Sequence, residues 1–296
     1  MEFSLDSSDK DYWIKTISNY CLEIKKDGTI KDYDIIIDSK VYVKDLEPFH
    51  ITLLACFLHL LQANKDTKLN IITNKDLSHF LKDELQLDVY FNNYKRKHQK
   101  AKSEHILNLW QVESSKTMEY TNSVESYFQK RFFAGKDLTA FVSSLEEIYF
   151  NVCDHSKSRT DAYSYINYKE DSKYIQVAVC DFGVGIPTSL RNGGIVYSND
   201  KEYLENSIKR GVTCQSSTHN KGFGLDNIIS ILQGKAYIRI VSNKALLLSD
   251  GTLNEETKKF NTKTFDLDFY FNGTLIYIDI PIETFEDTEI EDSFEF

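Results

Sequence analysis

The segment SSLEEIYFNVCDHS, residues 143–156, carries two acids and an amide at helical spacing. At about 100° per residue, Glu147, Asn151 and Asp154 fall on one side of a helix. An apolar stripe falls on another side and consists of Phe141, Leu145, Ile148 and Val152. Such a helix can bury its stripe and direct a hard amide oxygen toward magnesium and a carboxylate toward a water molecule. Alone, the pattern is equally typical of a helix with a solvated polar face.

A second candidate is VAVCDFGVGIP, residues 177–187, in which an apolar strand ends in an acid and two glycines. Asp181, at the strand end, is well placed to accept a hydrogen bond from an exocyclic amine such as that of adenine. Gly183 and Gly185 permit positive φ and close backbone approach. An ordinary turn between a strand and a loop gives the same string.

The third candidate is HNKGFGLDNI, residues 219–228, where Gly222 and Gly224 come directly before an amphipathic helical stretch. Backbone amides at a helix N-terminus form an anion site that suits a polyphosphate. Glycines also begin helices for purely structural reasons. This segment therefore indicates a nucleotide site only in combination with the other two segments, in this order along the chain.

In this order, the three segments resemble the N box, first glycine box and second glycine box of the GHKL ATPases, the superfamily of gyrase, the heat-shock chaperone, histidine kinases and MutL. The resemblance covers about residues 103–282. FNGTLIYIDIP, residues 271–281, is similar to the closing Gly-Thr and strand of the family. The chain has no GxxxxGK[ST] segment, which separates it from P-loop proteins.

The resemblance implies bound ATP and Mg²⁺ and a role for each matching residue. Glu147 would position the attacking water, Asn151 would bind magnesium and Asp181 would read adenine. Asp154 matches an acid near the nucleotide, with His155 beside it as in the kinase-like branches. The remaining residues expected at the nucleotide are Gly183, Gly185, Ile186, Lys221, Gly222, Gly224, Leu225 and Thr274.

Residues 188–220 would form the ATP lid, which we expect to be polar and to order on nucleotide binding. The run KRGVTCQSSTHNKGFGL, residues 209–225, looks most like the lid end of ATPases related to anti-sigma factors and histidine kinases. The fold implied for residues 103–282 is α+β, a Bergerat-type α/β sandwich in which a mixed, mostly antiparallel sheet lies under a helical layer.

The spacing of apolar residues predicts the helices and strands that must position these residues. In the first 102 residues we expect alternating strands and helices and hence a largely parallel sheet; the strands are 32–38, 68–73 and 87–91, and the helices are 48–64 and 76–85. Beyond them we expect strands at 106–110, 162–168, 173–180, 236–241, 265–271 and 275–280, with helices at 118–133, 136–156 and 223–233.

We therefore expect three parts: a small α/β domain (1–102), the ATP-binding domain (103–282) and an acidic, loose tail (283–296). The first domain resembles a STAS domain, although its turn KDLEPFH, residues 44–50, lacks the serine that typical members phosphorylate. An unrelated small α/β domain would give the same alternation. The basic stretch 94–102 is interpreted as a solvated linker, with phosphate or nucleic-acid contact as the alternative.

The bulk composition narrows the class of protein. The 296 residues carry a net charge of -10, which makes broad nucleic-acid binding unlikely as a function. Five scattered cysteines suit a reducing compartment, and the longest apolar run, residues 53–61, is too short to span a bilayer. We expect a cytoplasmic protein without a membrane partner.

Three functions share these motifs. The first is an ATP/Mg-binding regulatory protein with slow hydrolysis, whose lid closure controls a protein partner or self-association as a homodimer. The second is an anti-sigma-type serine protein kinase. The third is a nucleotide-dependent interaction module without turnover, in signalling or defence. The helix before the N box contains no histidine, which argues against a histidine kinase.

Overall fold

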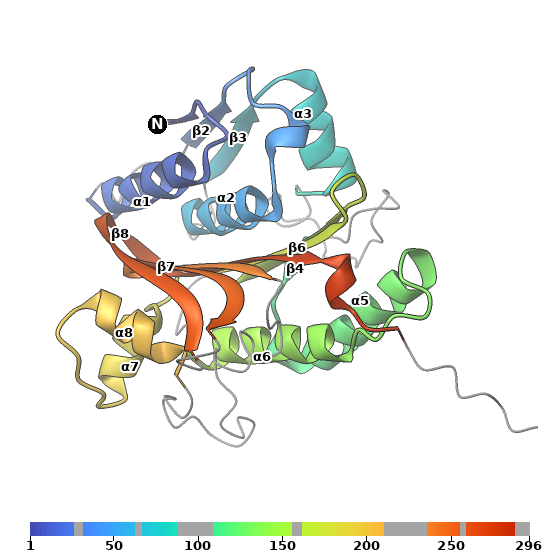
Figure 1. The fold of residues 1–296 in the computed structure, drawn as a ribbon. Coiled ribbons are helices and arrows are strands. Elements are labelled where there is room, and N and C mark those ends of the chain that lie inside the picture. Colours follow the sequence, from blue (N-terminus) through green and yellow to red (C-terminus); the bar gives the residue numbers. More distant parts are fainter. Residues whose placement is uncertain are drawn as a thin grey trace, which may run out of the picture.

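The computed structural model of the protein describes residues 1–26, 32–62, 67–87, 109–155, 162–209, 236–254 and 259–287. They form an α+β fold of alternating layers (Figure 1). A small sheet lies outermost, followed by helices α1 and α2, a five-stranded sheet, and a second layer of helices on the far side. The predicted α+β class is confirmed. The domain boundary expected after residue 102 lies outside the described residues.

The N-terminal module contains a parallel sheet with strand order β1-β2-β3, as the alternation predicts. Its elements are β1 (Glu2–Leu5), α1 (Lys10–Lys26), β2 (Asp32–Ile37), α2 (Pro48–Leu61) and β3 (Lys68–Ile72), followed by α3 (Lys75–His79) and a π-helical turn (Phe80–Glu84). Helices α1 and α2 lie on one face of this sheet (Figure 1), as expected when two successive crossovers of the same hand join neighbouring parallel strands in the order β1-β2-β3. The expected strand at 87–91 lies almost wholly outside the described residues.

Strand β1 and helix α1 were not predicted from the sequence. Helix α1 is rich in charge, but it buries one stripe at helical spacing, formed by Trp13, Ile14, Ile17 and Cys21. The hydroxyl of Tyr20 on α1 donates to the backbone of Ser4 on β1 at 3.0 Å. A stripe of this kind is sufficient to fix a helix whose average composition is polar.

Helix α2 is apolar on all sides because it lies between two sheets. Twelve of its 14 residues are buried, among them His50 and Thr52. The Thr52 hydroxyl donates to the Pro48 carbonyl at 2.9 Å, so the helix satisfies its own buried hydroxyl. The helix predicted over residues 48–64 is confirmed, with Pro48 at its first turn.

The five-stranded sheet has the order β4-β5-β6-β8-β7, and each neighbouring pair is antiparallel. Its strands are β4 (Trp110–Gln111), β5 (Tyr163–Lys169), β6 (Tyr174–Asp181), β7 (Tyr237–Asn254) and β8 (Lys259–Pro281). The two strands predicted at 265–271 and 275–280 are parts of β8, and β7 continues well beyond the predicted end at 241. Register shifts at Asn243 let these long strands bend without losing their pairing.

Helices α5 (Thr117–Arg131) and α6 (Thr139–His155) cover the face of this sheet that points away from the N-terminal module, close to their predicted bounds. Two short helices, α7 (Ile186–Asn192) and α8 (Asp200–Ser207), lie near the bent β7–β8 hairpin. They occupy the first half of the segment expected to form the ATP lid. That half is folded because α7 and α8 bury Leu190, Tyr203 and Leu204.

The start of the predicted loose tail is attached to the fold. Residues Ile282–Thr284 form a 3₁₀ turn, and Phe285 is buried in the core beside α6. Lys136 pairs with the Asp287 carboxylate at 2.7 Å. The expectation was wrong for residues 283–287, because one aromatic anchor among acids is enough to hold the backbone; residues 288–296 lie outside the described part.

The N-terminal module and the five-stranded sheet share one apolar core. Residues of α1 and α2 pack against the sheet face that includes Tyr165, Ala178, Cys180 and Leu275. The thiol of Cys56 on α2 contacts the backbone oxygen of Cys180 on β6 at 3.1 Å. The module is therefore fixed to the back of the sheet by burial of apolar surface and is not held by a linker alone.

A polar cluster closes the edge of this shared core. The Tyr277 hydroxyl lies 2.5 Å from Glu47 at the start of α2 and 2.7 Å from Asp279 on β8. Lys10 pairs with Glu47 at 2.5 Å. Burial acts to raise the pKa of Glu47, but the hydrogen bonds from Lys10 and Tyr277 outweigh it and hold that pKa below its ordinary value. Burial also raises the pKa of Asp279, which has no such cation in direct contact among the described residues.

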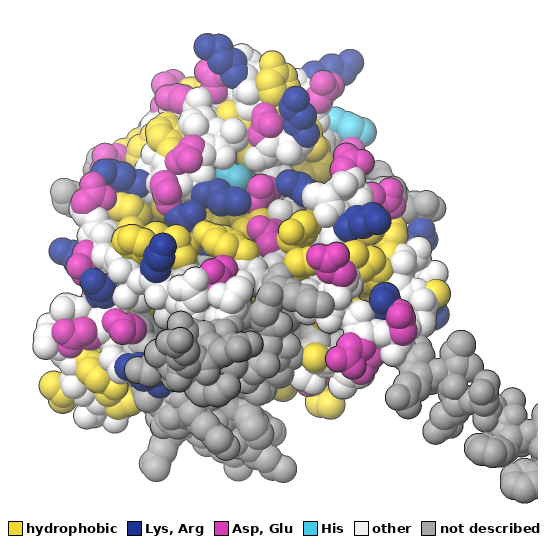
Figure 2. Space-filling view, viewed as in Figure 1, with side chains coloured by type: hydrophobic (Ala, Val, Ile, Leu, Met, Phe, Trp, Pro, Cys, Tyr) yellow, Lys and Arg dark blue, Asp and Glu magenta, His cyan; other side chains and the backbone are white. Residues whose placement is uncertain are grey.

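No helix among the described residues is both long and apolar enough to cross a membrane. On the face in Figure 2, the described Lys and Arg side chains are interspersed with Asp and Glu and form no continuous basic surface. This distribution agrees with the net charge of -10.

Candidate functional site

Helix α6 has the two faces that its sequence predicts. The apolar stripe is buried, with Phe141, Leu145, Ile148 and Val152 between 0% and 8% exposed. Glu147 and Asn151 are only partly buried. The Asn151 amide donates from Nδ2 to the Glu147 carboxylate at 3.1 Å, which directs the other end of the carboxamide, its oxygen, away from Glu147. The side chains of Asp154 and His155 lie outside the described part of the chain.

Three polar residues form a row across the neighbouring strands β6, β8 and β7. Asp181 pairs with Thr274, and Thr274 pairs with Ser242. On each strand, the side chains at every second position from these three residues enter the core beside α6; they are Ile175, Val177 and Val179 on β6, Ile276, Ile278 and Ile280 on β8, and Ile238 and Ile240 on β7. Because side chains alternate along a strand, the row faces the same side of the sheet as α6.

Asp181 is 2% exposed, and its carboxylate accepts a hydrogen bond from the Gly183 amide at 2.7 Å. Burial raises the pKa of Asp181 to about 7, although hydrogen bonds from the backbone of Gly183 and Thr274 oppose this rise. A carboxylate has about four acceptor positions, so it retains capacity for a further donor. A buried acid with a perturbed pKa and remaining acceptor capacity is typical of a functional site.

Close backbone packing explains two glycines of the site. Gly185 has φ +80°, and a Cβ on it would meet Asn243 Nδ2 at 2.4 Å and Ser242 Oγ at 2.8 Å. Gly273 has φ +115°, and its Cβ would meet the Asp181 carbonyl oxygen at 2.0 Å. Only glycine fits both positions. Gly183 is not among the described glycines with positive φ; its backbone amide donates to the Asp181 carboxylate.

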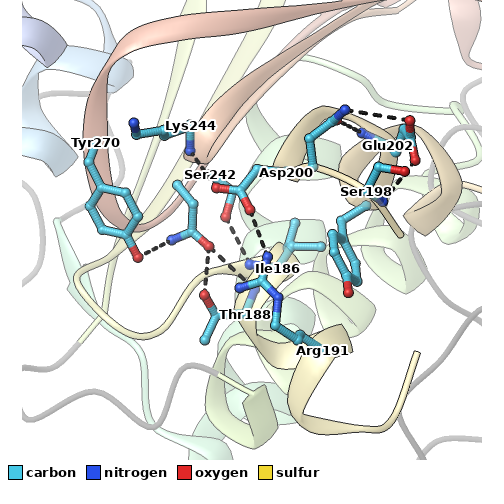
Figure 3. Close-up of polar contacts among 12 residues, drawn as sticks. Ile186, Thr188, Arg191, Ser198, Asp200, Glu202, Ser242, Lys244 and Tyr270 are labelled. Atoms are coloured by element: carbon cyan, nitrogen blue, oxygen red, sulfur yellow. Dashed lines mark hydrogen bonds and ion pairs between the residues drawn. The ribbon is translucent and has the colours of Figure 1, made fainter. Parts of the chain in front are cut away.

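The loop after Asp181 is held by two residues of β7 that the motifs did not reveal. Ser242 Oγ accepts from the Ile186 amide at 2.8 Å. Asn243 lies at φ 51° and is fully buried. Its amide donates to the Val184 carbonyl at 3.1 Å and accepts from the Thr188 hydroxyl at 2.9 Å. Figure 3 shows Ser242, Ile186 and Thr188 converging here from β7 and α7.

Two further contacts complete this arrangement. The Tyr270 hydroxyl accepts from Asn243 Nδ2 at 2.9 Å (Figure 3). Asn272 Nδ2 donates to the Phe182 carbonyl at 3.1 Å. Asn272 lies inside the quoted segment 271–281 but was not named as a site residue. For Ser242, Asn243 and Tyr270 the only sequence signal was their place beside the predicted strand ends, since isolated Ser, Asn and Tyr residues form no recognisable motif.

Helices α7 and α8 are joined by an ion pair between Arg191 and Asp200 at 3.0 Å (Figure 3). The Asp200 carboxylate also accepts from the Lys244 amide on β7 at 3.2 Å. The first half of the predicted lid is thereby tied to the sheet. The predicted site residues Lys221, Gly222, Gly224 and Leu225 lie outside the described residues, as does the helix expected at 223–233.

Within the described part of the chain, no group of three or more His, Cys, Asp or Glu side chains could hold a metal ion. Magnesium that arrives with a triphosphate takes most of its ligands from phosphate and water, and often only one or two from protein. The amide oxygen of Asn151 has the chemistry for such a ligand.

Comparison of the chain with protein-family models and with curated proteins finds no match.

Proposed function

We propose that this protein binds ATP with Mg²⁺ between α6 and the row Asp181–Thr274–Ser242, hydrolyses it slowly, and acts as a regulatory switch of the GHKL type. The observation that carries the proposal is the row itself. The register of β6 and β8 aligns the predicted adenine acid with the predicted threonine, on the sheet face that α6 covers, and the register of β7 adds Ser242. The motifs from which these residues were predicted lie more than 90 positions apart in sequence, so their alignment is independent support.

The acceptor character of the row suits the amino edge of a purine. The Asp181 carboxylate is buried and retains acceptor positions, and Thr274 is 8% exposed beside it. A site that pairs buried acceptors with a ligand's donors discriminates strongly, because a ligand without those donors leaves the acceptors unpaired. The close backbone packing at Gly185 and Gly273 fixes the position of these groups.

The polar face of α6 would act at the phosphates. Bound magnesium would offset the charge of the phosphate oxygens, and Asn151 would supply its protein oxygen. Glu147, one turn earlier, would orient a water molecule and accept its proton. The hydrogen bond between Asn151 and Glu147 holds the two groups in a fixed relation on one face.

The N-terminal module would carry the output of the switch. It packs on the back of the sheet, where Cys56 on α2 contacts the backbone of Cys180, the residue before Asp181. The residue next to Asp181 in the chain therefore contacts the module directly, so a movement of the backbone at Asp181 would reach α2. The same contact also favours the third function named above, an interaction module that binds nucleotide without turnover, because signalling through this route needs only binding.

The test is incubation of the full chain with ATP labelled at the γ-phosphate, in the presence of Mg²⁺. Release of labelled phosphate supports the switch with slow hydrolysis. Label on a co-purified protein supports a serine kinase, and saturable binding without either supports the interaction module. Absence of ATP binding would contradict all three.

A further inference from the structure

Ser242 is the most enclosed member of the polar row. It is 0% exposed, and its hydroxyl contacts three groups: the Gly273 carbonyl oxygen at 2.9 Å, the Ile186 amide at 2.8 Å and the Thr274 hydroxyl at 3.1 Å. A serine hydroxyl has one hydrogen to donate and two lone pairs. All of its capacity is therefore in use.

The direction of each hydrogen bond follows from the partners. The Gly273 carbonyl can only accept, so Ser242 donates its single hydrogen there. The Ile186 amide can only donate, so it fills one lone pair of Ser242. The contact with Thr274 then requires Thr274 to be the donor, since Ser242 has no hydrogen left.

Thr274 consequently has its only hydroxyl hydrogen directed at Ser242. Its lone pairs remain for other partners, so Thr274 can only accept hydrogen bonds from a ligand. The carboxylate of Asp181, on the neighbouring strand at the same register, is a second acceptor.

We infer that Ser242 is a positioning residue: it fixes the Thr274 hydroxyl as an acceptor and so makes the row select a base edge with an amine over one with a carbonyl. This inference rests on the proposed nucleotide site but assigns a role to a residue outside its motifs. In Ser242→Ala, the Thr274 hydroxyl is free to turn and donate to a carbonyl.

The experiment compares ATP with inosine triphosphate, in which a carbonyl replaces the amine at position 6 and the adjacent N1 carries a hydrogen. Affinities are measured by calorimetry at pH 8, above the pKa of about 7 of Asp181, so that its carboxylate is ionised. The wild type should prefer ATP. In Ser242→Ala this preference should fall about fivefold, the effect of one neutral hydrogen bond. An unchanged ratio in a variant that still binds ATP would overturn the inference.

Two further variants separate positioning from general damage. Ser164→Ala removes another fully buried hydroxyl of the same sheet, which bonds Tyr149 at 2.8 Å, and should lower stability without changing the ratio. Ser242→Cys keeps the side-chain shape in a slightly larger group that is a weak donor and a weak acceptor, and it should lower the ratio if Ser242→Ala does not fold. A ratio shifted equally by Ser164→Ala would also overturn the inference, whereas a wild type that binds neither nucleotide would contradict the proposed function itself.

Discussion

The backbone of Gly273 lies so close to that of Asp181 that a methyl group on Gly273 would approach the Asp181 carbonyl oxygen at 2.0 Å. This contact brings β8 against the end of β6 and fixes the relation between Thr274 and the acid. The same Asp181 carboxylate accepts the amide of Gly183, so the glycine loop and the Gly-Thr pair are joined through one residue.

Gly273→Ala should therefore destabilise the protein by more than backbone strain alone explains. We expect a loss on the order of 3 kcal/mol, from the positive φ together with a collision between backbone atoms. Gly194 provides a matched control, because it has φ +86° and no atom lies within 4 Å of the position that a Cβ would take. Gly194→Ala should cost about 1 kcal/mol, from strain only. Urea unfolding measures both, and equal losses would refute the close contact.

Glu147→Gln should abolish turnover and preserve nucleotide binding. Loss of a residue that accepts a proton from water lowers the rate by about 10²-fold or more, while the amide keeps the shape of the side chain. Glu146→Gln is the control on the same helix, since Glu146 accepts from the Thr121 hydroxyl at 2.9 Å toward α5. Phosphate release and ATP affinity are measured for both variants. Full turnover in Glu147→Gln would exclude its catalytic role.

The pH dependence of stability should carry a contribution from Asp181. Its pKa rises from 3.8 to about 7 on folding because of burial, so the folded chain holds this proton more tightly than the unfolded chain. The stabilisation is full below about pH 4 and declines as the pH rises to about 7. The stability of the wild type relative to Asp181→Asn should fall by up to about 1.4 kcal/mol for each pH unit in this window. A constant difference in denaturant unfolding between pH 4 and pH 8 would contradict this.

The interface between the N-terminal module and the sheet should show energetic coupling between Glu47 and Tyr277. Tyr277→Phe removes a hydroxyl that lies 2.5 Å from Glu47, and it should cost about 1–3 kcal/mol. Glu47→Gln in the Tyr277→Phe background should cost less than in the wild type. A pairing of Tyr277→Phe with Ser164→Ala should be additive and serves as the control, because Ser164 shares no partner with Tyr277 and contacts Tyr149 of α6 on the other face of the sheet. Additive effects of Tyr277→Phe and Glu47→Gln would show that the contact between these two side chains does not stabilise the interface.

The sequence predicted those parts of the fold whose signal is local. The stripe of α6, the apolar strand before Asp181 and the predominantly apolar α2 each follow from the pattern of apolar residues within about 15 residues. Strand β1 and helix α1 were missed because charged residues separate the few apolar positions, of which Trp13 and Ile17 are the anchors. Their burial comes from packing against β2 and the large sheet, which local propensity does not contain.

The sequence predicted those residues of the candidate site that belong to recognisable motifs. Asp181 and Thr274 were named from strings, but their alignment with Ser242 depends on strand order and register, which are non-local properties. Asn243 is a single asparagine at a bulge, and nothing in its neighbourhood distinguishes it from a turn residue. The packing of the N-terminal module on the back of the sheet could not be predicted either, because its contacts join residues far apart in the sequence, such as Cys56 and Cys180.

The central claim is that Asp181 belongs to an adenine nucleotide site, and calorimetric titration with ATP and Mg²⁺ at pH 8 tests it most directly. We predict saturable binding of one ATP per chain in the wild type. The affinity of Asp181→Asn should be at least about tenfold lower, because a carboxamide oxygen is a weaker hydrogen-bond acceptor than a carboxylate oxygen and its NH₂ group would face the amine of adenine. Binding of equal affinity in the two proteins, or no binding in the wild type at millimolar ATP, would contradict the account.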